Sequence, residues 1–473
     1  MLEIFNIING FLWGKLLVYL LIGTGVYFTI RLGFIQIRHF LHTFTVMRNS
    51  RKSDKEGISS FQALSTSLAA RVGTGNLAGV AIAISVGGPG AIFWMWVIAL
   101  LGMATSFAES TLAQAYKVHD DDGNFRGGPA YYMERGLNAR WMGSLFAVLL
   151  IIAFGLVFNA VQANSIAAAL HESFGLNKIN IGITLFVVSG VIIFTGIRGI
   201  ARISEKIVPI MALSYLLIAL CVVLMNLNQI PAILSLIFDS AFGWKEATGG
   251  AFGAMVMTGV QRGLFSNEAG MGSAANAAAT ASPYPPHPAS QGYVQMLGVF
   301  IDTIVICTAT ASIILLSGGV ESFTNMGGVE ITQRALASQV GDWGGQFVAI
   351  ALMFFAFTSI IANYSYAETN LMFLQHKHSH GVNTLRVTVL GMIMFGATQS
   401  NEVIWALADV SMGLMAIVNL IAILLLSNEV VKLAKDYNQQ LNAGKLPTFD
   451  RTKIPELDRK IAPGIWEKNK INV

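Results

Sequence analysis

The chain has 473 residues, of which 54% are hydrophobic and only 12% are charged, about half the charged share of an ordinary soluble domain. Its apolar residues gather in runs of about 20, the length of a helix that crosses a ~30 Å hydrocarbon layer, so the composition excludes a soluble globular protein and predicts an all-α polytopic protein in a lipid bilayer. The net charge of +4 follows from basic residues beside these runs and implies no nucleic-acid partner.

Taken in chain order, the apolar runs predict eleven transmembrane helices. They cover about residues 13–33, 61–84, 88–116, 143–170, 179–197, 207–226, 250–280, 290–317, 345–375, 384–399 and 402–428. With the N-terminus outside, 24 of the 30 Lys and Arg residues lie at cytoplasmic ends, loops and tail, which is the asymmetry that fixes orientation in membrane proteins. We therefore expect a multi-pass protein of a bacterial cell membrane (inner or plasma membrane), with the N-terminus out and the C-terminus in.

Two of the runs are not uninterrupted hydrophobic helices. The second contains SLAARVGTGNLAG (67–79) and the seventh contains QRGLFSNEAGMGSAANAAA (261–279). Glycine loosens a helix, and polar residues beside it leave backbone groups that lipid cannot satisfy, so we expect breaks at 73–76 and near 265–272. If only one run contained such small and polar residues, close packing of helices could explain them without a binding site. Two runs at matching positions favour a binding site in mid-membrane.

Each broken run opens a group of five predicted helices, and the odd number inverts one group relative to the other across the membrane. This layout is typical of secondary transporters, whose sites lie between the two repeats. The predicted divisions are an extra N-terminal helix with a basic cytoplasmic loop (1–60), a first repeat (61–226), an extracellular connector (227–249), a second repeat (250–428) and a basic cytoplasmic tail (429–473).

Four stretches resemble a known family. GGPGAIFWMWVIALLG (87–102) is similar to the signature of the alanine or glycine:cation symporter family, and RVGTGN, VQANS (161–165) and FSNEAGMGS (265–273) accompany it in the order and spacing of that family. The resemblance covers essentially the whole chain. It implies a LeuT-type 5+5 inverted repeat with one extra N-terminal helix, and sodium-coupled symport of alanine, glycine or a close relative without an organic cofactor.

A zwitterionic amino acid needs donors for its carboxylate and acceptors for its ammonium group. Amides freed at a half-helix N-terminus favour an anion through both their hydrogen bonds and the helix dipole, and carbonyls freed around 265–270 would accept from the ammonium. Gln162 resembles the polar side chain that the family places in the pocket, although it could instead only join helices. The predicted substrate-binding residues are Gly73, Thr74, Gly75, Asn76, Gln162, Phe265, Asn267 and Asn363.

Sodium is a hard cation that prefers about five or six oxygen ligands, which hydroxyls and carbonyls supply without net charge. Thr358 and Ser359 lie side by side in the predicted span 345–375. In LeuT-type sodium sites such a pair faces carbonyls of the first broken helix, so the resemblance implies sodium at Ala69, Val72, Phe355, Thr358 and Ser359. Hydroxyls of this kind also bond to their own helix, which is the alternative interpretation.

Charged residues inside predicted spans are costly in lipid and are expected to pair. We expect salt bridges among Arg71, Arg262 and the carboxylates Glu109, Glu268, Asp302, Glu368 and Asp409. Structural pairs or gates are favoured over substrate contacts for this set, with Glu268 as the exception because it lies in a predicted break. The run HKHSH (376–380) could bind a metal ion, but a solvated cytoplasmic turn is favoured.

The function predicted is therefore a sodium-coupled symporter for a small neutral amino acid, working by alternating access. A membrane enzyme is disfavoured, since no intramembrane catalytic motif is present, and a channel would normally gather several copies about a pore. A proton-coupled transporter of the same fold stays open as the alternative. The choice among alanine, glycine, serine and their D-forms, and the oligomeric state, are left open by the sequence.

Overall fold

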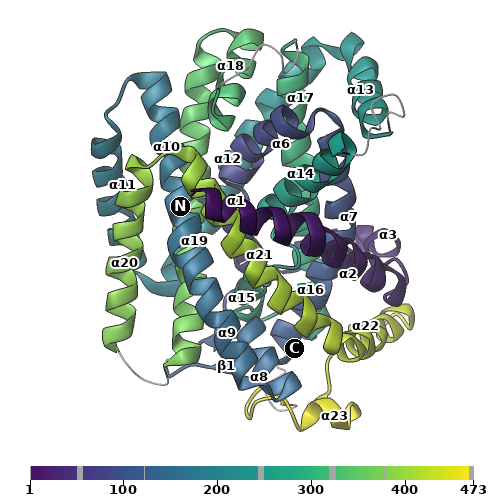
Figure 1. The fold of residues 1–473 in the computed structure, drawn as a ribbon. Helices are drawn as coiled ribbons and strands as arrows, with labels where there is room; N and C mark the ends of the chain where they lie inside the picture. Colours follow the sequence, from purple (N-terminus) through teal and green to yellow (C-terminus); the bar gives the residue numbers. More distant parts are fainter. Residues whose placement is uncertain are drawn as a thin grey trace.

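The computed structural model describes residues 2–50, 57–121, 123–242, 250–318, 326–375 and 379–467. Within these ranges the chain is all-α apart from one short antiparallel hairpin, β1 (Val118–His119) with β2 (Phe125–Arg126). Figure 1 shows a single bundle of long helices with shorter helices at its two ends. The predicted class of all-α membrane protein is confirmed.

Every predicted span is helical in the part of the chain that the structure describes. In chain order these helices are α1 (Leu2–Phe11), η1 (Leu12–Leu17) and α2 (Val18–Arg31); α5 (Ser60–Arg71), η2 (Gly75–Gly79) and α6 (Val80–Gly87); α7 (Gly90–Ala115); α9 (Arg140–Leu150), η3 (Ile151–Phe158) and α10 (Asn159–Phe174); α11 (Lys178–Ile193); α12 (Gly196–Met225); α14 (Gly250–Asn267) and α15 (Ser273–Ala279); α16 (Pro288–Val299), η5 (Phe300–Cys307) and α17 (Thr308–Leu316); α19 (Trp343–Leu374); α20 (Ser379–Thr398); and α21 (Asn401–Leu425).

The shorter helices lie between or after these spans. They are α3 (Ile35–Arg38), α4 (Phe40–Arg48), α8 (Pro129–Leu137), η4 (Leu227–Gln229), α13 (Ile230–Phe242), α18 (Gly328–Val340), α22 (Ser427–Asn442), η7 (Arg451–Lys453) and α23 (Pro455–Asp458).

Length and apolarity qualify eight helical segments of the described chain as membrane spans, and the pair α5 and η2–α6, bent by 52°, makes a ninth. The other two predicted spans fall short for physical reasons: α11 has only 16 residues, and the run 250–280 is divided between α14 and α15. The count of eleven stays a prediction. Helix α12 begins at Gly196, eleven residues before the predicted span 207–226.

The two groups of five helices show matching neighbours. Helix α7 packs against α16, α10 against α19, and α11 against α20, so the second, third and fourth members of the groups pair in order. A short helix also follows the second member of each group, α8 in one and α18 in the other. These correspondences are those expected of two related repeats, while the division into domains stays a prediction.

Small residues let the broken helix α14 approach α7 closely. A methyl group built on Gly259 would lie 2.6 Å from the carbonyl oxygen of Ala91, and one built on Gly263 would lie 2.5 Å from a side-chain carbon of Ile98. Both neighbours belong to the stretch GGPGAIFWMWVIALLG (87–102). That stretch therefore serves helix packing, as expected for small residues one turn apart.

The C-terminal tail folds back onto one end of the bundle. The amide of Phe449 donates to the carbonyl of Pro286 (2.9 Å), the indole of Trp466 donates to the carbonyl of Gln114 (3.0 Å), and Lys460 donates to the carbonyl of Gly136 (2.8 Å). Figure 1 shows α8, α22 and α23 at this end and α13 and α18 at the other. This separation agrees with the sides to which the predicted loops were assigned. Residues 243–249 and 468–473, parts of the predicted connector and tail, lie outside the described residues.

The predicted orientation gives a direct expectation for tagged protein. A membrane-impermeant reagent should label a C-terminal tag only when the reagent has access to the cytoplasm, and an N-terminal tag only from outside the cell. The reason is that most basic residues lie on the same side of the membrane as the C-terminal tail, which predicts that this side is cytoplasmic. Labelling of intact cells and of inverted vesicles measures both. If both termini react from the same side, the number of spans is even and the inverted repeat is wrong.

Candidate functional site

The first break lies between α5 and η2. Helix α5 ends at Arg71, Val72 is extended (φ −77°, ψ 95°), and helical structure resumes at Gly75. The amide of Gly73 donates to the Oδ1 of Asn76 at 2.9 Å. All residues of the break are buried, so their backbone groups must find partners inside the protein.

Gln162 of α10 supplies one of these partners. Its Oε1 accepts from the amide of Thr74 (3.1 Å) and from the Thr74 hydroxyl (2.8 Å). An acceptor oxygen therefore faces the N-terminus of the second half-helix, where donors and dipole favour an anion. The structure brings Gln162 into contact with the predicted break.

The second break lies between α14 and α15. Helix α14 ends at Asn267, and three residues of the connecting segment have positive φ, namely Glu268 (58°), Gly270 (99°) and Gly272 (80°). The Oδ1 of Asn267 accepts from the amide of Ala269 at 3.0 Å. This side chain therefore stabilises the break itself.

Phe265 joins the two breaks. A methyl group built on Gly75 would lie 3.0 Å from its Cδ1, and its ring packs 4.7 Å from those of Phe158 and Trp405. The aromatic side chains of η3, α14 and α21 thus cover the break at Gly75. This arrangement excludes water from the region where the freed amides lie.

The predicted sodium ligands are only partly assembled. The hydroxyl of Ser359 donates to the carbonyls of Ala69 (2.7 Å) and Phe355 (3.1 Å), so it links α19 to the last turn of α5. The Thr358 hydroxyl donates to Phe355 of its own helix at 2.9 Å. Val72 contributes its amide to the carbonyl of Leu68. Ala69, Phe355, Thr358 and Ser359 therefore form one connected set of oxygens.

Asn363 lies one turn beyond Ser359 on α19. Its Nδ2 donates to the Oδ1 of Asn159 on α10 at 3.2 Å. Its Oδ1 is buried and has no hydrogen-bond partner among the residues that the structure describes. The structure places Asn363 beside the third predicted helix of the first group, not at the first break.

One polar cluster was missed by the sequence analysis. Asp302 of η5 accepts from Asn76 at 2.7 Å and from Ser266 at 2.7 Å, and Thr303 donates to it at 2.8 Å. Because Asn76 also accepts from Gly73, its amide connects the first break to Asp302 and to α14. The only signal in the sequence was a carboxylate within an apolar run, which names no partner.

The buried charges pair as expected in one case only. Arg262 of α14 bonds to Asp409 of α21 at 2.6 Å, with the Trp405 ring 4.8 Å from its guanidinium. Glu368 pairs instead with Arg126, at 3.2 Å. The expectation was wrong for Arg71, which has no carboxylate within ion-pair distance in the described chain.

Arg71 is held by neutral acceptors. It donates to the carbonyl of Gln295 and to the Ser106 hydroxyl, both at 3.3 Å. The absence of a direct ion pair leaves its charge to act on the surrounding carboxylates over a longer distance. Of the run HKHSH, residues 376–378 and the side chains of 379 and 380 lie outside the described residues.

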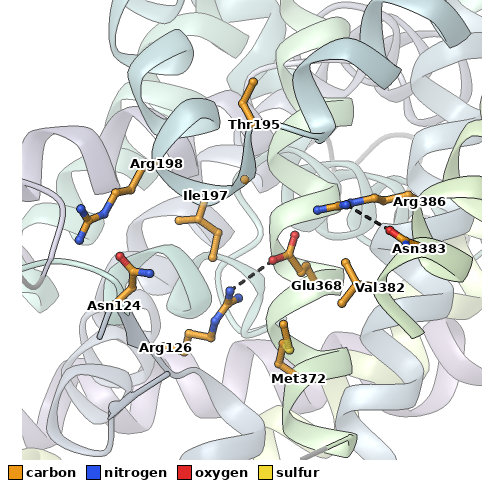
Figure 2. A pocket seen from close by; sticks show the side chains of 11 residues that line it. Asn124, Arg126, Thr195, Ile197, Arg198, Glu368, Met372, Val382, Asn383 and Arg386 are labelled. Carbon is orange, nitrogen blue, oxygen red and sulfur yellow. Dashed lines mark hydrogen bonds and ion pairs between the residues drawn. The ribbon is translucent and has the colours of Figure 1, made fainter. Parts of the chain in front are cut away.

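A cavity of about 460 Å³ lies at the end of the bundle that carries the hairpin (Figure 2). It is bounded by the start of α12, the end of α19 and the start of α20. Figure 2 shows Arg126 pointing toward Glu368 at the wall of the cavity, with Arg386 on the other side of Glu368. The lining residues are Asn124, Arg126, Thr195, Gly196, Ile197, Arg198, Glu368, Met372, Val382, Asn383 and Arg386.

A second, narrower cavity lies between α5, α12, α15 and α19. Ile197 lines both cavities, and Thr369, which lines the narrow one, follows Glu368 of the wide one. Arg126 bonds to Glu368 (3.2 Å) and approaches Thr369 (3.5 Å). The Arg126–Glu368 pair therefore lies in the wall of the wide cavity, and the narrow cavity next to it is lined by residues of the broken helices, Thr66 of α5 and Asn276 of α15.

Comparison with known proteins gives a consistent result along the chain. Residues 1–451 match the model of the sodium:alanine symporter family. The probable sodium/glutamine symporter GlnT of Bacillus subtilis is 52% identical over 448 residues, 94% of this chain and 93% of that protein. The amino-acid carrier protein AlsT of Bacillus subtilis is 49% identical over 469 residues (99% and 98%), and the sodium/alanine symporter AgcS of Methanococcus maripaludis is 41% identical over 444 residues (92% and 96%).

Proposed function

This chain belongs to the sodium:alanine symporter family, and from that premise we propose that it takes up a small neutral amino acid such as alanine or glycine together with sodium. Family and relatives are transporters, not enzymes. The names of the relatives include both alanine and glutamine, so the side chain of the substrate is a separate question. The single observation that carries the proposal is the convergence of Gln162 and Ser359 on Gly73.

That convergence is tight. A methyl group built on Gly73 would lie 2.6 Å from the Oγ of Ser359 and 2.9 Å from the Oε1 of Gln162. The proposed sodium ligand on α19 and the proposed substrate partner on α10 therefore meet at one residue of the first break. Sodium and the amino acid would bind on two sides of Gly73, and each would order the same backbone. Each ligand would therefore increase the affinity of the protein for the other, as symport requires.

The substrate carboxylate is proposed to bind the amides of residues 73–76. Gln162 already shows that an oxygen acceptor fits against the amide and hydroxyl of Thr74. A carboxylate gains more from these donors than a neutral amide oxygen does, because it is charged and faces a half-helix N-terminus. Binding would free Gln162 to contact the substrate. Carbonyls of the second break, next to Phe265 and Asn267, would accept from the ammonium.

Sodium is proposed to bind the carbonyls of Ala69, Val72 and Phe355 and the hydroxyls of Thr358 and Ser359. These groups carry no net charge and suit a hard monovalent cation. In place of donating to Ala69, the Ser359 hydroxyl would turn its lone pairs to the ion. Neutral ligands also avoid the desolvation cost of a buried carboxylate.

The proposed framework is a LeuT-type 5+5 inverted repeat with one extra N-terminal helix and eleven spans. The ordered packing of α7 with α16, α10 with α19 and α11 with α20 supports it. Two buried ion pairs lie on opposite sides of the breaks, Arg262–Asp409 and Arg126–Glu368. Alternating access would require these two pairs to open in turn, since each lies between a break and one end of the bundle.

Uptake of labelled alanine into proteoliposomes tests the proposed function. We expect an inward sodium gradient to drive accumulation that an equal potassium gradient does not, with a ratio of initial rates of roughly tenfold or more, since the ion site is selective for a hard cation of one size. Competition with a panel of small amino acids defines the substrates. Accumulation driven by a pH gradient in the absence of sodium would instead establish proton coupling.

A further inference from the structure

The wide cavity of Figure 2 has charged walls for which the proposed transport cycle supplies no ligand. Its volume of about 460 Å³ lies within the roughly 300–1,000 Å³ of small-molecule sites. Three arginines, Arg126, Arg198 and Arg386, line the cavity together with one carboxylate, that of Glu368. Most small-molecule sites are lined mainly by apolar side chains, so this concentration of charge indicates a ligand that is itself charged.

Glu368 provides an unused acceptor at the wall of this cavity. The residue is only 5% exposed. One oxygen of its carboxylate accepts from Arg126 at 3.2 Å. The other oxygen, Oε2, is buried and has no hydrogen-bond partner among the residues that the structure describes. An unpaired acceptor on a buried carboxylate is costly, and a ligand with a positively charged N–H donor would satisfy it.

Arg386 provides the opposite charge on the other side of Glu368 (Figure 2). Its Nε donates to the Tyr364 hydroxyl at 3.0 Å, its Nη1 donates to Asn383 at 3.3 Å, and its guanidinium lies 4.6 Å from the centre of the Phe194 ring. These contacts hold the guanidinium at the cavity wall. Within the described ranges, no carboxylate lies within ion-pair distance of it. Its charge is therefore available to an anionic group of a ligand.

The spacing of these two groups suits a ligand that bridges them. Tyr364, which accepts from Arg386, precedes Glu368 by four residues on α19, so these two side chains share one helix face about 6 Å apart along the axis. Arg386 and Glu368 are therefore neighbours without a direct ion pair. An amino acid carries its ammonium and carboxylate groups on one carbon and can bind both residues. A simple anion would leave Glu368 Oε2 unpaired and would be repelled by its charge.

We propose that this cavity is a second amino-acid site, in which Arg386 binds the carboxylate and Glu368 Oε2 binds the ammonium group. The inference rests on the proposed function for the identity of the ligand, and it adds a place where the amino acid is held at the end of the bundle that is predicted to be cytoplasmic. The cavity is lined by none of the proposed sodium ligands. Both residues contact only the groups that all neutral amino acids share. Binding there is therefore independent of sodium and tolerant of the side chain.

Ligand-observed NMR on the purified protein in sodium-free buffer tests the inference. We expect alanine, leucine and glutamine to bind and to displace one another, because the site recognises their common groups. Ethylamine and propionate each lack one of the two charges. Each should bind about tenfold or more weakly than alanine, since it loses a hydrogen-bonded charged contact.

Replacing Arg386 by glutamine separates the second site from the first. Arg386→Gln should weaken sodium-independent alanine binding about tenfold or more and change sodium-dependent binding less than about threefold. Arg140→Gln is the matched control. Arg140 begins α9 and also lies over a phenylalanine ring, that of Phe373 at 5.3 Å, but it does not line the cavity. This variant should bind alanine like the wild type. If Arg386→Gln does not fold, the panel of ligands on the wild type decides alone.

Three results would overturn the inference. The first is propionate or inorganic phosphate that binds as tightly as alanine, which would indicate a site for anions, including the phosphate of lipid headgroups. The second is unchanged sodium-independent binding in Arg386→Gln, and the third is the absence of alanine binding without sodium. Sodium-dependent binding that persists in any of these cases would leave the proposed function standing. Sodium-independent binding with no sodium-dependent binding of any neutral amino acid would refute the proposed function instead.

Discussion

Replacing Gly73 by alanine should abolish sodium-dependent amino-acid binding while the protein still folds. The new methyl group would lie 2.6 Å from Ser359 Oγ and 2.9 Å from Gln162 Oε1. Both atoms are ends of side chains that can turn away, so the cost to folding is at the low end of the ~1–3 kcal/mol of overpacking. The cost to function is large, because the same movement displaces a proposed sodium ligand and the proposed substrate partner. We expect alanine affinity to fall at least about 100-fold, or ~2.7 kcal/mol.

Binding of labelled alanine in sodium, with thermal unfolding measured in parallel, checks this expectation. Gly391→Ala on α20 is the matched control, since a methyl group there has no neighbour within 4 Å. It should bind alanine like the wild type. Normal alanine binding by Gly73→Ala would show that neither ligand approaches this part of the first break.

Removing the hydroxyls of Thr358 and Ser359 together should weaken sodium binding sharply. Each hydroxyl offered to a cation contributes about 1.5–3 kcal/mol, or roughly 10–100-fold in affinity. Ser359→Ala alone should have most of this effect, because only its hydroxyl reaches Ala69 across the helix interface. Thr358→Ala should be milder, since its hydroxyl bonds to Phe355 of its own helix.

The measurement is the sodium concentration that half-saturates alanine uptake. Ser312→Ala on α17 is the control, because Ser312 also bonds to a carbonyl of its own helix, that of Thr308 (2.8 Å), and has no proposed ligand role. An unchanged sodium requirement in the double variant would place the ion elsewhere. The cluster around Asp302 and Asn76 would then be the next candidate, because it contains the nearest buried carboxylate to the first break.

The broken helices could be predicted from the sequence because their signal is local. Glycine and polar residues within an apolar run predict a break whatever the position of the run in the fold. Helix α5 ends at Arg71 and α14 ends at Asn267, close to the expected positions. Family resemblance added Gln162, which the structure places against Thr74. The first prediction depended on residue types and spacing, and the second on the resemblance.

Partners between distant helices could not be predicted in the same way. Asp302 meets Asn76 across 226 positions and Arg126 meets Glu368 across 242, and any of several buried carboxylates would have satisfied the same rule of charge pairing. Arg71 shows the limit of that rule, since its two terminal nitrogens donate to Gln295 and Ser106 and not to a carboxylate. Helix ends also depend on packing, which is why α12 extends eleven residues before its predicted start.

The most direct test of the central claim is an experimental structure of the protein with alanine and sodium bound. The account predicts the alanine carboxylate within hydrogen-bond distance of the Thr74 amide, Gln162 moved from its bond to that amide, and sodium beside Ser359 and the carbonyl of Ala69. An amino acid held at Asp302 or elsewhere, with Gln162 still bonded to Thr74, would contradict it.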